Sequence, residues 1–371
     1  MTEKPGILKR QKPQTDWLLL ATAGLLVIIG LIAIYDASVV SAFRDFGDRF
    51  YYVKNQLAWA ALGFLVLGFF SFFNYHKILK FSTAIFVVGI ILLVLVLIPG
   101  IGTQVLGAKR WISIASFTFQ PSEFAKLATI FYAVTIMAKF EKYKIRLIDS
   151  ALVYFLPILI VAALVILEPD FGTSLIFFVL TLSIYFIAGA PFWHFAVSLP
   201  LLILGAIATV IKEPYRLERI RTFLDPQYDP QGSSYQINQI ITAMVSGGLL
   251  GVGLGSSRAK FDFIPEVHND AIFAVIVEEL GFVGAIILIS IFLLLITRAI
   301  SVAKNARDYE GKLLAGGITA FITIQILLNL GSNVALVPLT GVSLPFISYG
   351  GSSLFVTLAA IGILLNIRRQ S

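Results

Sequence analysis

The chain has 371 residues, of which 58% are hydrophobic and 13% are charged, and it contains no cysteine. Soluble domains carry about a quarter charged residues, so this composition excludes an ordinary cytosolic enzyme. The lack of cysteine excludes disulfides, thiolate nucleophiles and cysteine zinc sites. A net charge of +7 in such a chain is typical of membrane topology and lipid contact, so no nucleic-acid partner is expected.

Apolar runs of membrane-spanning length recur along the sequence. They predict an all-α polytopic membrane protein with about ten transmembrane helices, over residues 17–35, 56–73, 81–99, 122–139, 151–168, 172–189, 192–211, 271–297, 313–337 and 346–366. The alternative for the first run is a signal peptide cleaved near Val40 to Ala42, but the run is longer than the usual signal core. One long kinked element is the alternative for the sixth and seventh runs, and Pro191 at a helix start favours two helices.

The basic residues of the short connections predict the orientation. Most of them lie on the side of the N-terminus, which the positive-inside rule assigns to the cytoplasm. We therefore expect a cytoplasmic tail over 1–16, one transmembrane domain over 17–367 and a cytoplasmic tail over 368–371. The segments rich in glycine, proline and charge lie on the outer face, above all the long loop of about 212–270 between the seventh and eighth spans. Any chemistry is expected there.

Glu123 and Lys126 are charged residues at the outer end of the fourth span, and their spacing places them on one helix face. Charges at membrane depth are costly and are normally paired or functional. We expect this pair to support catalysis, with a purely structural ion pair as the alternative. Gln120 and Ser122, in the same segment, are expected to contact substrate.

Lys109, Arg110 and Trp111 precede that span. Two adjacent bases beside an interfacial tryptophan suit a lipid diphosphate, because the bases pair with phosphates and the ring lies at headgroup depth. The alternative is an aromatic anchor with bases that extend to the membrane surface.

Residues 215–224 open the long loop with an amphipathic pattern. Apolar side chains share one face, which is typical of a helix lying on the membrane surface. Arg216, Arg219 and Arg221 would also present guanidinium groups to an anionic headgroup.

The densest group of titratable residues closes the loop, directly before the eighth span: Asp262, Glu266, His268 and Asp270. Asp270 is the candidate general base, and the other three are expected to contact substrate. The alternative role for Asp270 is to cap the following helix; a helix N-terminus would lower its pKa, whereas desolvation would raise it. His268 by itself is more typical of a loop or packing histidine than of a metal ligand.

Three further patterns predict structural roles. Five glycines within 247–255 indicate a re-entrant or closely packed segment rather than a dinucleotide site, because no strand–turn–helix context surrounds them. Gln325, Asn329 and Asn333 form a stripe suited to hydrogen bonds between helices. The Glu-Pro-Asp sequence at 168–170 is typical of helix breaking and capping.

Together these segments resemble the SEDS family of bacterial cell-wall polymerases (FtsW, RodA and SpoVE). The resemblance covers nearly the whole chain and rests on GAKRWI (107–112), FQPSEFAK (119–126), LEPDFGTS (167–174), RTFLDPQYDPQGSSYQ (221–236), GGLLGVGLG (247–255), FIPEVHND (263–270), EELG (278–281) and LPFISYGGSS (344–353). The last motif contains Ser348, a further expected substrate contact. The sequence is more similar to the division member, FtsW, than to the elongation member, RodA. Asn269 stands where the family typically has threonine, and Asp262 stands where FtsW-like members usually carry glutamate.

The resemblance implies an inverting peptidoglycan glycosyltransferase that polymerises lipid II at the outer face of the bacterial cytoplasmic membrane, in division or elongation. A GlcNAc 4-hydroxyl would attack the anomeric carbon of the donor MurNAc, and undecaprenyl diphosphate would leave. Asp270 would supply the base, and the bases named above would stabilise the diphosphate. A divalent cation, Mg or Mn, is compatible with this chemistry but not required by it, and no protein metal site is expected.

The implied partners are lipid II, a class B penicillin-binding protein, other divisome or elongasome proteins and membrane lipids. Two other classes of function compete with the polymerase. A lipid II flippase would move the same substrate without bond chemistry, and it predicts polar residues at mid-membrane depth and a path open on both sides. A scaffold that only organises other wall enzymes would tolerate the loss of Asp270. The concentration of charge on one side favours an enzyme.

Overall fold

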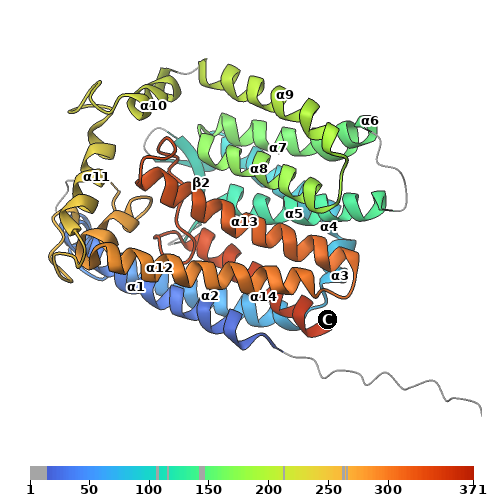
Figure 1. The fold of residues 1–371 in the computed structure, drawn as a ribbon, viewed down its shortest axis with the longest axis horizontal. Helices are drawn as coiled ribbons and strands as arrows, with labels where there is room; N and C mark the ends of the chain where they lie inside the picture. The colour runs from blue at the N-terminus through green and yellow to red at the C-terminus, as the bar shows by residue number, and fades with distance from the viewer. Residues whose placement is uncertain are drawn as a thin grey trace, which may run out of the picture.

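A computed structural model describes residues 15–105, 108–114, 117–141, 147–211, 214–260, 264 and 266–371 of the chain. Most helices run roughly parallel in one bundle (Figure 1). Each of the ten predicted spans overlaps a helix: α1 (Trp17–Phe46), α2 (Tyr51–Phe72), α4 (Ser82–Leu97), α5 (Pro121–Phe140), α7 (Leu156–Leu167) with the preceding π-helical η1 (Ser150–Phe155), α8 (Phe171–Ile187), α9 (Phe192–Ile211), α12 (Ile272–Lys304), α13 (Tyr309–Asn333) and α14 (Gly351–Gln370). The described residues also form α3 (Tyr75–Lys80), α6 (Leu147–Asp149), α10 (Pro214–Leu224) and α11 (Tyr235–Gly247).

Among the described residues, six helical segments are long and apolar enough to cross a membrane: α1, α2, η1 with α7, α12, α13 and α14. The helices α4, α8 and the first part of α9 are shorter apolar helices. Large apolar side chains on the outside of the bundle, such as Ile28, Leu65 and Phe282, are more than half exposed, which suits contact with lipid rather than water. The chain is therefore a helical membrane protein as predicted, and the number of spans stays a prediction.

The centre of the bundle consists of α5, α13 and α14, most of whose residues are buried. Glycine allows the helices to approach closely. A Cβ at Gly362 of α14 would come within 2.5 Å of the carbonyl oxygen of Leu67 in α2, so the two backbones touch at this point, as membrane helices commonly do at small residues.

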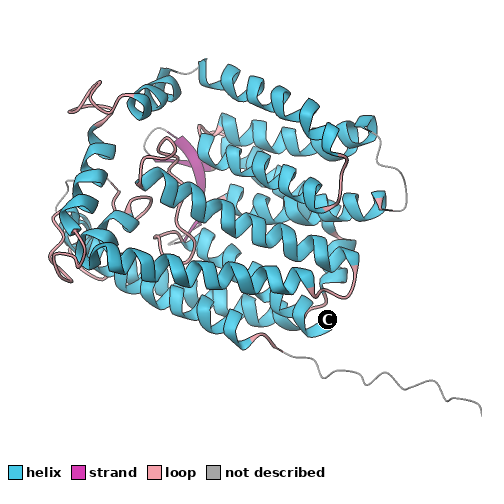
Figure 2. Ribbon diagram, in the orientation of Figure 1, coloured by secondary structure: helices cyan, strands magenta, loops and turns pink. Residues whose placement is uncertain are grey.

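A three-stranded antiparallel sheet, which the sequence did not predict, lies between α4 and α5 (Figure 2). Its strands are β1 (Gly102–Val105), β2 (Ala108–Ile114) and β3 (Phe117–Phe119), in the order β1-β2-β3. Trp111 pairs with Thr103, and Ile112 pairs with Phe119. The sheet therefore fixes the basic segment of β2 next to the start of α5.

The two ends of the bundle differ in structure. The sheet, α10 and α11 lie at one end, whereas α3 and the C-terminus lie at the opposite end (Figure 1). Residues 346–350, predicted to begin the last span, form a turn and loop instead. The cause is local backbone geometry: Phe346 has a φ of 67°, and Gln56 of α2 bonds to the Ser348 carbonyl and the Gly350 N–H.

The glycine-rich segment packs closely against α12, as one of the two expected alternatives predicted. The helix is interrupted at Gly281, which has a φ of 68°. A Cβ there would lie 2.4 Å from the backbone nitrogen of Gly251. The interruption lets the backbone N–H groups of Val252 and Phe282 bond to the carbonyls of Glu278 and Gly248 respectively.

Candidate active site

Asp270 is the last residue of a turn that precedes α12. The N-cap of α12 is Ala271 and makes no side-chain capping bond, so the carboxyl group of Asp270 is not used as a helix cap. Its backbone carbonyl accepts hydrogen bonds of 2.9 Å from the side-chain amides of Asn329 and Asn333 in α13. The predicted polar stripe therefore fixes the position of this aspartate. Its Oδ1 is buried and has no hydrogen-bond partner among the described residues.

The surroundings of Asp270 make its carboxylate more basic than usual. Burial raises its pKa to about 6, against the opposing effects of its own backbone N–H and the charge of Arg219, while the charge of Glu266 raises it further. Of the two effects weighed in the sequence analysis, desolvation therefore dominates. At neutral pH the group is mostly ionised, yet it accepts a proton more readily than an ordinary aspartate.

Four segments distant in sequence meet around Asp270. Its Oδ2 lies 3.8 Å from the position of a Cβ on Gly341, and Arg219 of α10 donates a 2.7 Å hydrogen bond to the carbonyl of Leu339. The start of α8 packs on the same loop, because a Cβ on Gly172 would come within 2.3 Å of the Thr340 carbonyl. The structure thus brings the predicted loop helix and the predicted base together.

Arg110 of β2 connects the sheet to the start of α8. It donates to the backbone carbonyls of Glu168, at 3.1 Å, and Pro169, and its Nε lies 3.8 Å from Asp170 Oδ2. Asp170 accepts a hydrogen bond from the backbone N–H of Thr173 and so caps α8, as the sequence predicted.

A second arginine reaches the same connection from α10. Arg216 of α10 donates to the carbonyl of Ile166 in α7, at 3.1 Å. The two arginines therefore converge on the α7–α8 connection.

Glu168, for which the sequence predicted only a role in helix breaking, is a buried acid. Its side chain is inaccessible, and both carboxyl oxygens lack a hydrogen-bond partner among the described residues. Burial raises its pKa to about 9, reinforced by Asp170 and partly opposed by Arg110. Glu168 is therefore a neutral carboxylic acid at neutral pH. The only signal in the sequence was an acid placed between an apolar span and a proline.

Glu123 and Lys126 form the predicted ion pair, with 2.7 Å between Oε1 and Nζ and both side chains almost fully buried. Lys126 Nζ lies 5.5 Å from the ring centre of Phe321 in α13. Phe321 precedes Asn329 by about two helical turns, or roughly 11 Å along α13, so the pair lies deeper in the bundle than Asp270. Several polar atoms are buried without a hydrogen-bond partner among the described residues: Ser122 Oγ, Glu123 Oε2 and both side-chain polar atoms of Gln325. Polar groups therefore continue inward below Asp270.

Three other residues predicted to contact substrate, His268, Glu266 and Ser348, make contacts within the protein. His268 is buried beside the rings of Tyr52 and Tyr349, at 4.2 and 5.6 Å, and burial lowers its pKa to about 4, so it is a neutral packing residue. Glu266 is half exposed and accepts a 2.6 Å hydrogen bond from Asn269. Ser348 is buried and accepts a bond from the N–H of Leu344, which holds the loop before α14.

For other candidates the structure gives position only. Lys109 and Trp111 are partly exposed on β2, Gln120 is partly exposed next to α5, and Arg221 is exposed on α10. The backbone N–H of Gln120 donates to Ser352 Oγ at 3.0 Å. Asp262 lies outside the described residues. The substrate contacts assigned to these residues stay predictions.

One group of potential metal ligands occurs among the described residues: His76, Asp308 and Glu310, whose ligand atoms lie within 4.8 Å of one another. It stands near the start of α13, whereas Asp270 stands near the end of that helix. Both ring nitrogens of His76 already contact oxygens, of Asn74 and Asp308. This group is therefore separate from the site around Asp270.

Comparison with known proteins finds similar chains over nearly the whole length of this one. The chain is 41% identical to stage V sporulation protein E of Bacillus subtilis, over 97% of this chain and 99% of that protein. It is 39% identical to a probable peptidoglycan glycosyltransferase FtsW of Trichlorobacter lovleyi, over 95% and 92% of the two chains.

Two solved structures are similar in fold. The rod shape determining protein RodA of Thermus thermophilus has a TM-score of 0.70 and 26% identity, and the match covers 96% of this chain and 97% of that one. A chain from a structure described as "Structural coordination of polymerization and crosslinking by a peptidoglycan synthase complex" has a TM-score of 0.78 and 28% identity, over 96% and 98%. The sequence profile of the FtsW/RodA/SpoVE family, described as "Cell cycle protein", matches residues 16–371. The chain therefore belongs to the FtsW/RodA/SpoVE family.

Proposed function

We propose that this protein is a peptidoglycan glycosyltransferase that polymerises lipid II, with Asp270 as the general base. The observation that carries the proposal is the state of that carboxyl group: it caps no helix, one oxygen is buried without a partner, and burial raises its pKa to about 6. The relatives named peptidoglycan glycosyltransferase FtsW support the same reaction class.

In the proposed reaction, the Asp270 carboxylate takes the proton of the acceptor GlcNAc 4-hydroxyl while that oxygen forms a bond to the anomeric carbon of the donor MurNAc. The bond between that carbon and the diphosphate oxygen breaks, and its electron pair leaves with undecaprenyl diphosphate. Attack from the opposite face inverts the centre and gives a β-1,4 linkage. A base with a pKa near 6 is suited to this step, since it is ionised at neutral pH and still takes up a proton.

The departing diphosphate gains negative charge, and cations fixed beside it stabilise the transition state. Arg219 lies close enough to influence the ionisation of Asp270, and Arg110 and Arg216 meet at the α7–α8 connection. The side chain of Lys109, next to Arg110, has no ion pair or hydrogen bond in the described part of the chain. We assign these four residues to the diphosphate. The steps above need only protein groups and assign no role to a divalent cation.

The proposed topology places Asp270 at the outer face of the bacterial cytoplasmic membrane and both termini in the cytoplasm. It rests on the basic residues of the short connections and on the separation of the sheet, α10 and α11 from the C-terminal end of the bundle (Figure 1). The similarity to a chain of a peptidoglycan synthase complex supports a transpeptidase partner, which we take to be a class B penicillin-binding protein.

The test uses the purified full chain in liposomes with labelled lipid II and that partner. We expect the wild type to produce glycan strands and Asp270→Asn to produce none. Asp225→Asn is the matched control, because this acid of the same loop only accepts a turn hydrogen bond from the N–H of Gln227. Equal polymerisation by Asp270→Asn and the wild type would show that Asp270 is not the general base. Transfer of lipid II across the bilayer without polymerisation would support the flippase instead.

A further inference from the structure

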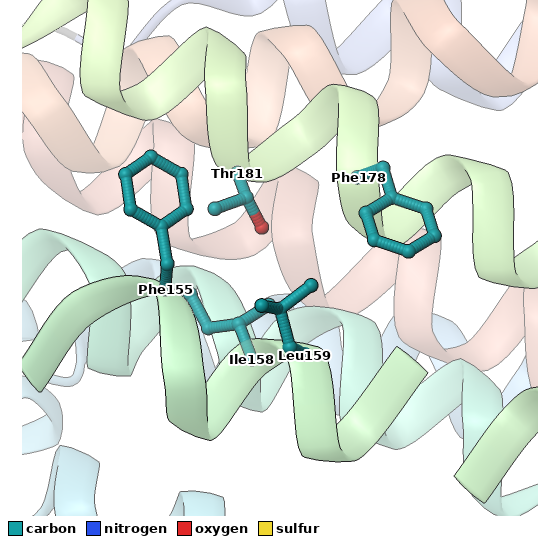
Figure 3. Close-up of a pocket in the computed structure, with 5 residues that line it drawn as sticks. All are labelled: Phe155, Ile158, Leu159, Phe178 and Thr181. Atoms are coloured by element: carbon teal, nitrogen blue, oxygen red, sulfur yellow. The ribbon is translucent and has the colours of Figure 1, made fainter. Parts of the chain in front are cut away.

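A groove of about 700 Å³ lies between α8, α12 and α13, with Phe195 of α9 beside it. This volume is in the range of small-molecule sites, roughly 300–1,000 Å³. The small cavity between η1–α7 and α8 is very different (Figure 3): it measures about 10 Å³ and is lined by Phe155, Ile158, Leu159, Phe178 and Thr181, so it is a gap in helix packing. The groove has room for a ligand, and the cavity does not.

The wall of the groove is effectively apolar. Apart from two lysines, its polar residues are Ser183, Thr319 and Thr323. Each hydroxyl donates a 2.7 Å hydrogen bond to the carbonyl one turn earlier in its own helix. Their donors are therefore already used, and the neighbouring surface consists of side chains such as Phe186, which is 64% exposed. Such a surface suits a hydrocarbon chain and gives little to a sugar or peptide.

Two cations stand together at one end of the groove. Lys304 is the last residue of α12, Lys312 lies near the start of α13, and both line the groove. Both are exposed, and neither side chain makes an ion pair or hydrogen bond with any residue that the structure describes. Two acids lie between them in sequence. Asp308 is engaged by Tyr75 and His76 at 2.6 Å each, and a carboxylate oxygen of Glu310 lies within 4.8 Å of the same His76 and Asp308. The positive charge at this end of the groove is therefore available to a ligand.

We propose that this groove binds an anionic glycerophospholipid, with an acyl chain along the apolar wall and the headgroup phosphate between Lys304 and Lys312. An apolar channel that ends at two ammonium groups matches an amphiphile with a hydrocarbon tail and a negative head. The α12–α13 connection lies at the end of the bundle that carries the C-terminus (Figure 1). In the proposed topology the lipid comes from the cytoplasmic leaflet, at the opposite end from Asp270.

The test is native mass spectrometry of the full chain released from nanodiscs that contain phosphatidylcholine as the major and phosphatidylglycerol as the minor lipid. We expect the wild type to retain phosphatidylglycerol in preference to phosphatidylcholine. The double variant Lys304→Gln/Lys312→Gln should lose roughly tenfold or more of this preference, since each lysine near an anionic headgroup contributes on the order of a fivefold factor. The matched control is Lys77→Gln/Lys80→Gln in α3, which removes two exposed lysines outside the groove.

A second variant tests the acyl chain separately. Ala320→Phe adds a ring to the groove wall and leaves both lysines in place, so retention of both lipids should fall together. The proposal is overturned if the wild type shows no preference for the anionic lipid, or if the α3 control loses the preference as fully as the groove variant. It is also overturned if Ala320→Phe retains lipid as the wild type does, or if a polyprenyl phosphate or a second protein chain occupies the groove in place of phospholipid.

Discussion

Two acidic sites of this chain, Asp270 and the pair Glu278 and Glu279, lie within ten residues of each other and have opposite environments. Glu278 accepts hydrogen bonds from the Ser257 hydroxyl and from the backbone N–H groups of Arg258 and Ala259. Glu279 accepts from the N–H of Ser257 and from Lys260, which also pairs with Asp36. Asp270, by contrast, keeps one buried oxygen without any partner in the described part of the chain.

The difference separates a structural acid from a chemical one. A buried carboxylate whose oxygens all accept hydrogen bonds is held in place and stabilises the segment that donates them. A buried carboxylate with a free oxygen costs stability, and such groups are concentrated at functional sites. Sequence alone does not make the distinction, because all three acids precede or occupy the same apolar span.

The largest expected effect is on catalysis. Asp270→Asn keeps the size of the side chain but removes the base, so the polymerisation rate should fall by about 10²–10⁴-fold, the usual contribution of a general base. The unfolding temperature should stay the same or rise slightly, because the change removes a desolvated charge. Single-turnover kinetics and thermal unfolding of the same preparation measure both. A large loss of stability would mean that Asp270 is structural after all.

Removing the cation that pairs with the structural acid Glu279 should affect stability rather than catalysis. Lys260→Met leaves Glu279 and Asp36 without their cation, and breaking a buried ion pair in this way costs about 3–5 kcal/mol. We expect a lower unfolding temperature and near-normal activity in the molecules that remain folded. Lys54→Met is the control, since Lys54 pairs with Asp48 at the surface, where its side chain is 67% exposed, and such pairs contribute little. An unchanged unfolding temperature for Lys260→Met would contradict the comparison.

A smaller effect is expected from the residues that position Asp270. Asn329→Leu removes the bonds to the carbonyls of Asp270 and Val342, and a small displacement of a catalytic group lowers kcat by roughly ten- to a hundredfold. KM should change little. Gln325→Leu is the control, because this side chain makes no bond to Asp270 and has no partner among the described residues. Equal losses in the two variants would argue against positioning by Asn329.

The sequence predicted the fold well where periodicity and composition carry the information. All ten apolar runs overlap helices, and the Asp170 cap and the Glu123–Lys126 pair are present. The features that the sequence did not predict depend on contacts between residues that are distant in the chain. Lys260 meets Asp36 across most of the chain, and the short strands of the sheet are stabilised by one another rather than by a local pattern. The sequence identified Asp270 by its position directly before a span, but only its hydrogen-bond partners distinguish a helix cap from a general base.

The pH dependence of the polymerisation rate tests the central claim most directly. The active form of Asp270 is the carboxylate, so the wild-type rate should fall as the pH drops below about 6, the pKa that burial gives this group. Arg219 lowers that pKa, so in Arg219→Gln the fall should begin at higher pH, whereas Arg221→Gln, an exposed arginine of the same helix, should leave the midpoint in place. A wild-type rate that stays constant down to the pH range of an ordinary aspartate, or a midpoint that Arg219→Gln does not move, would contradict the assignment of Asp270 as base.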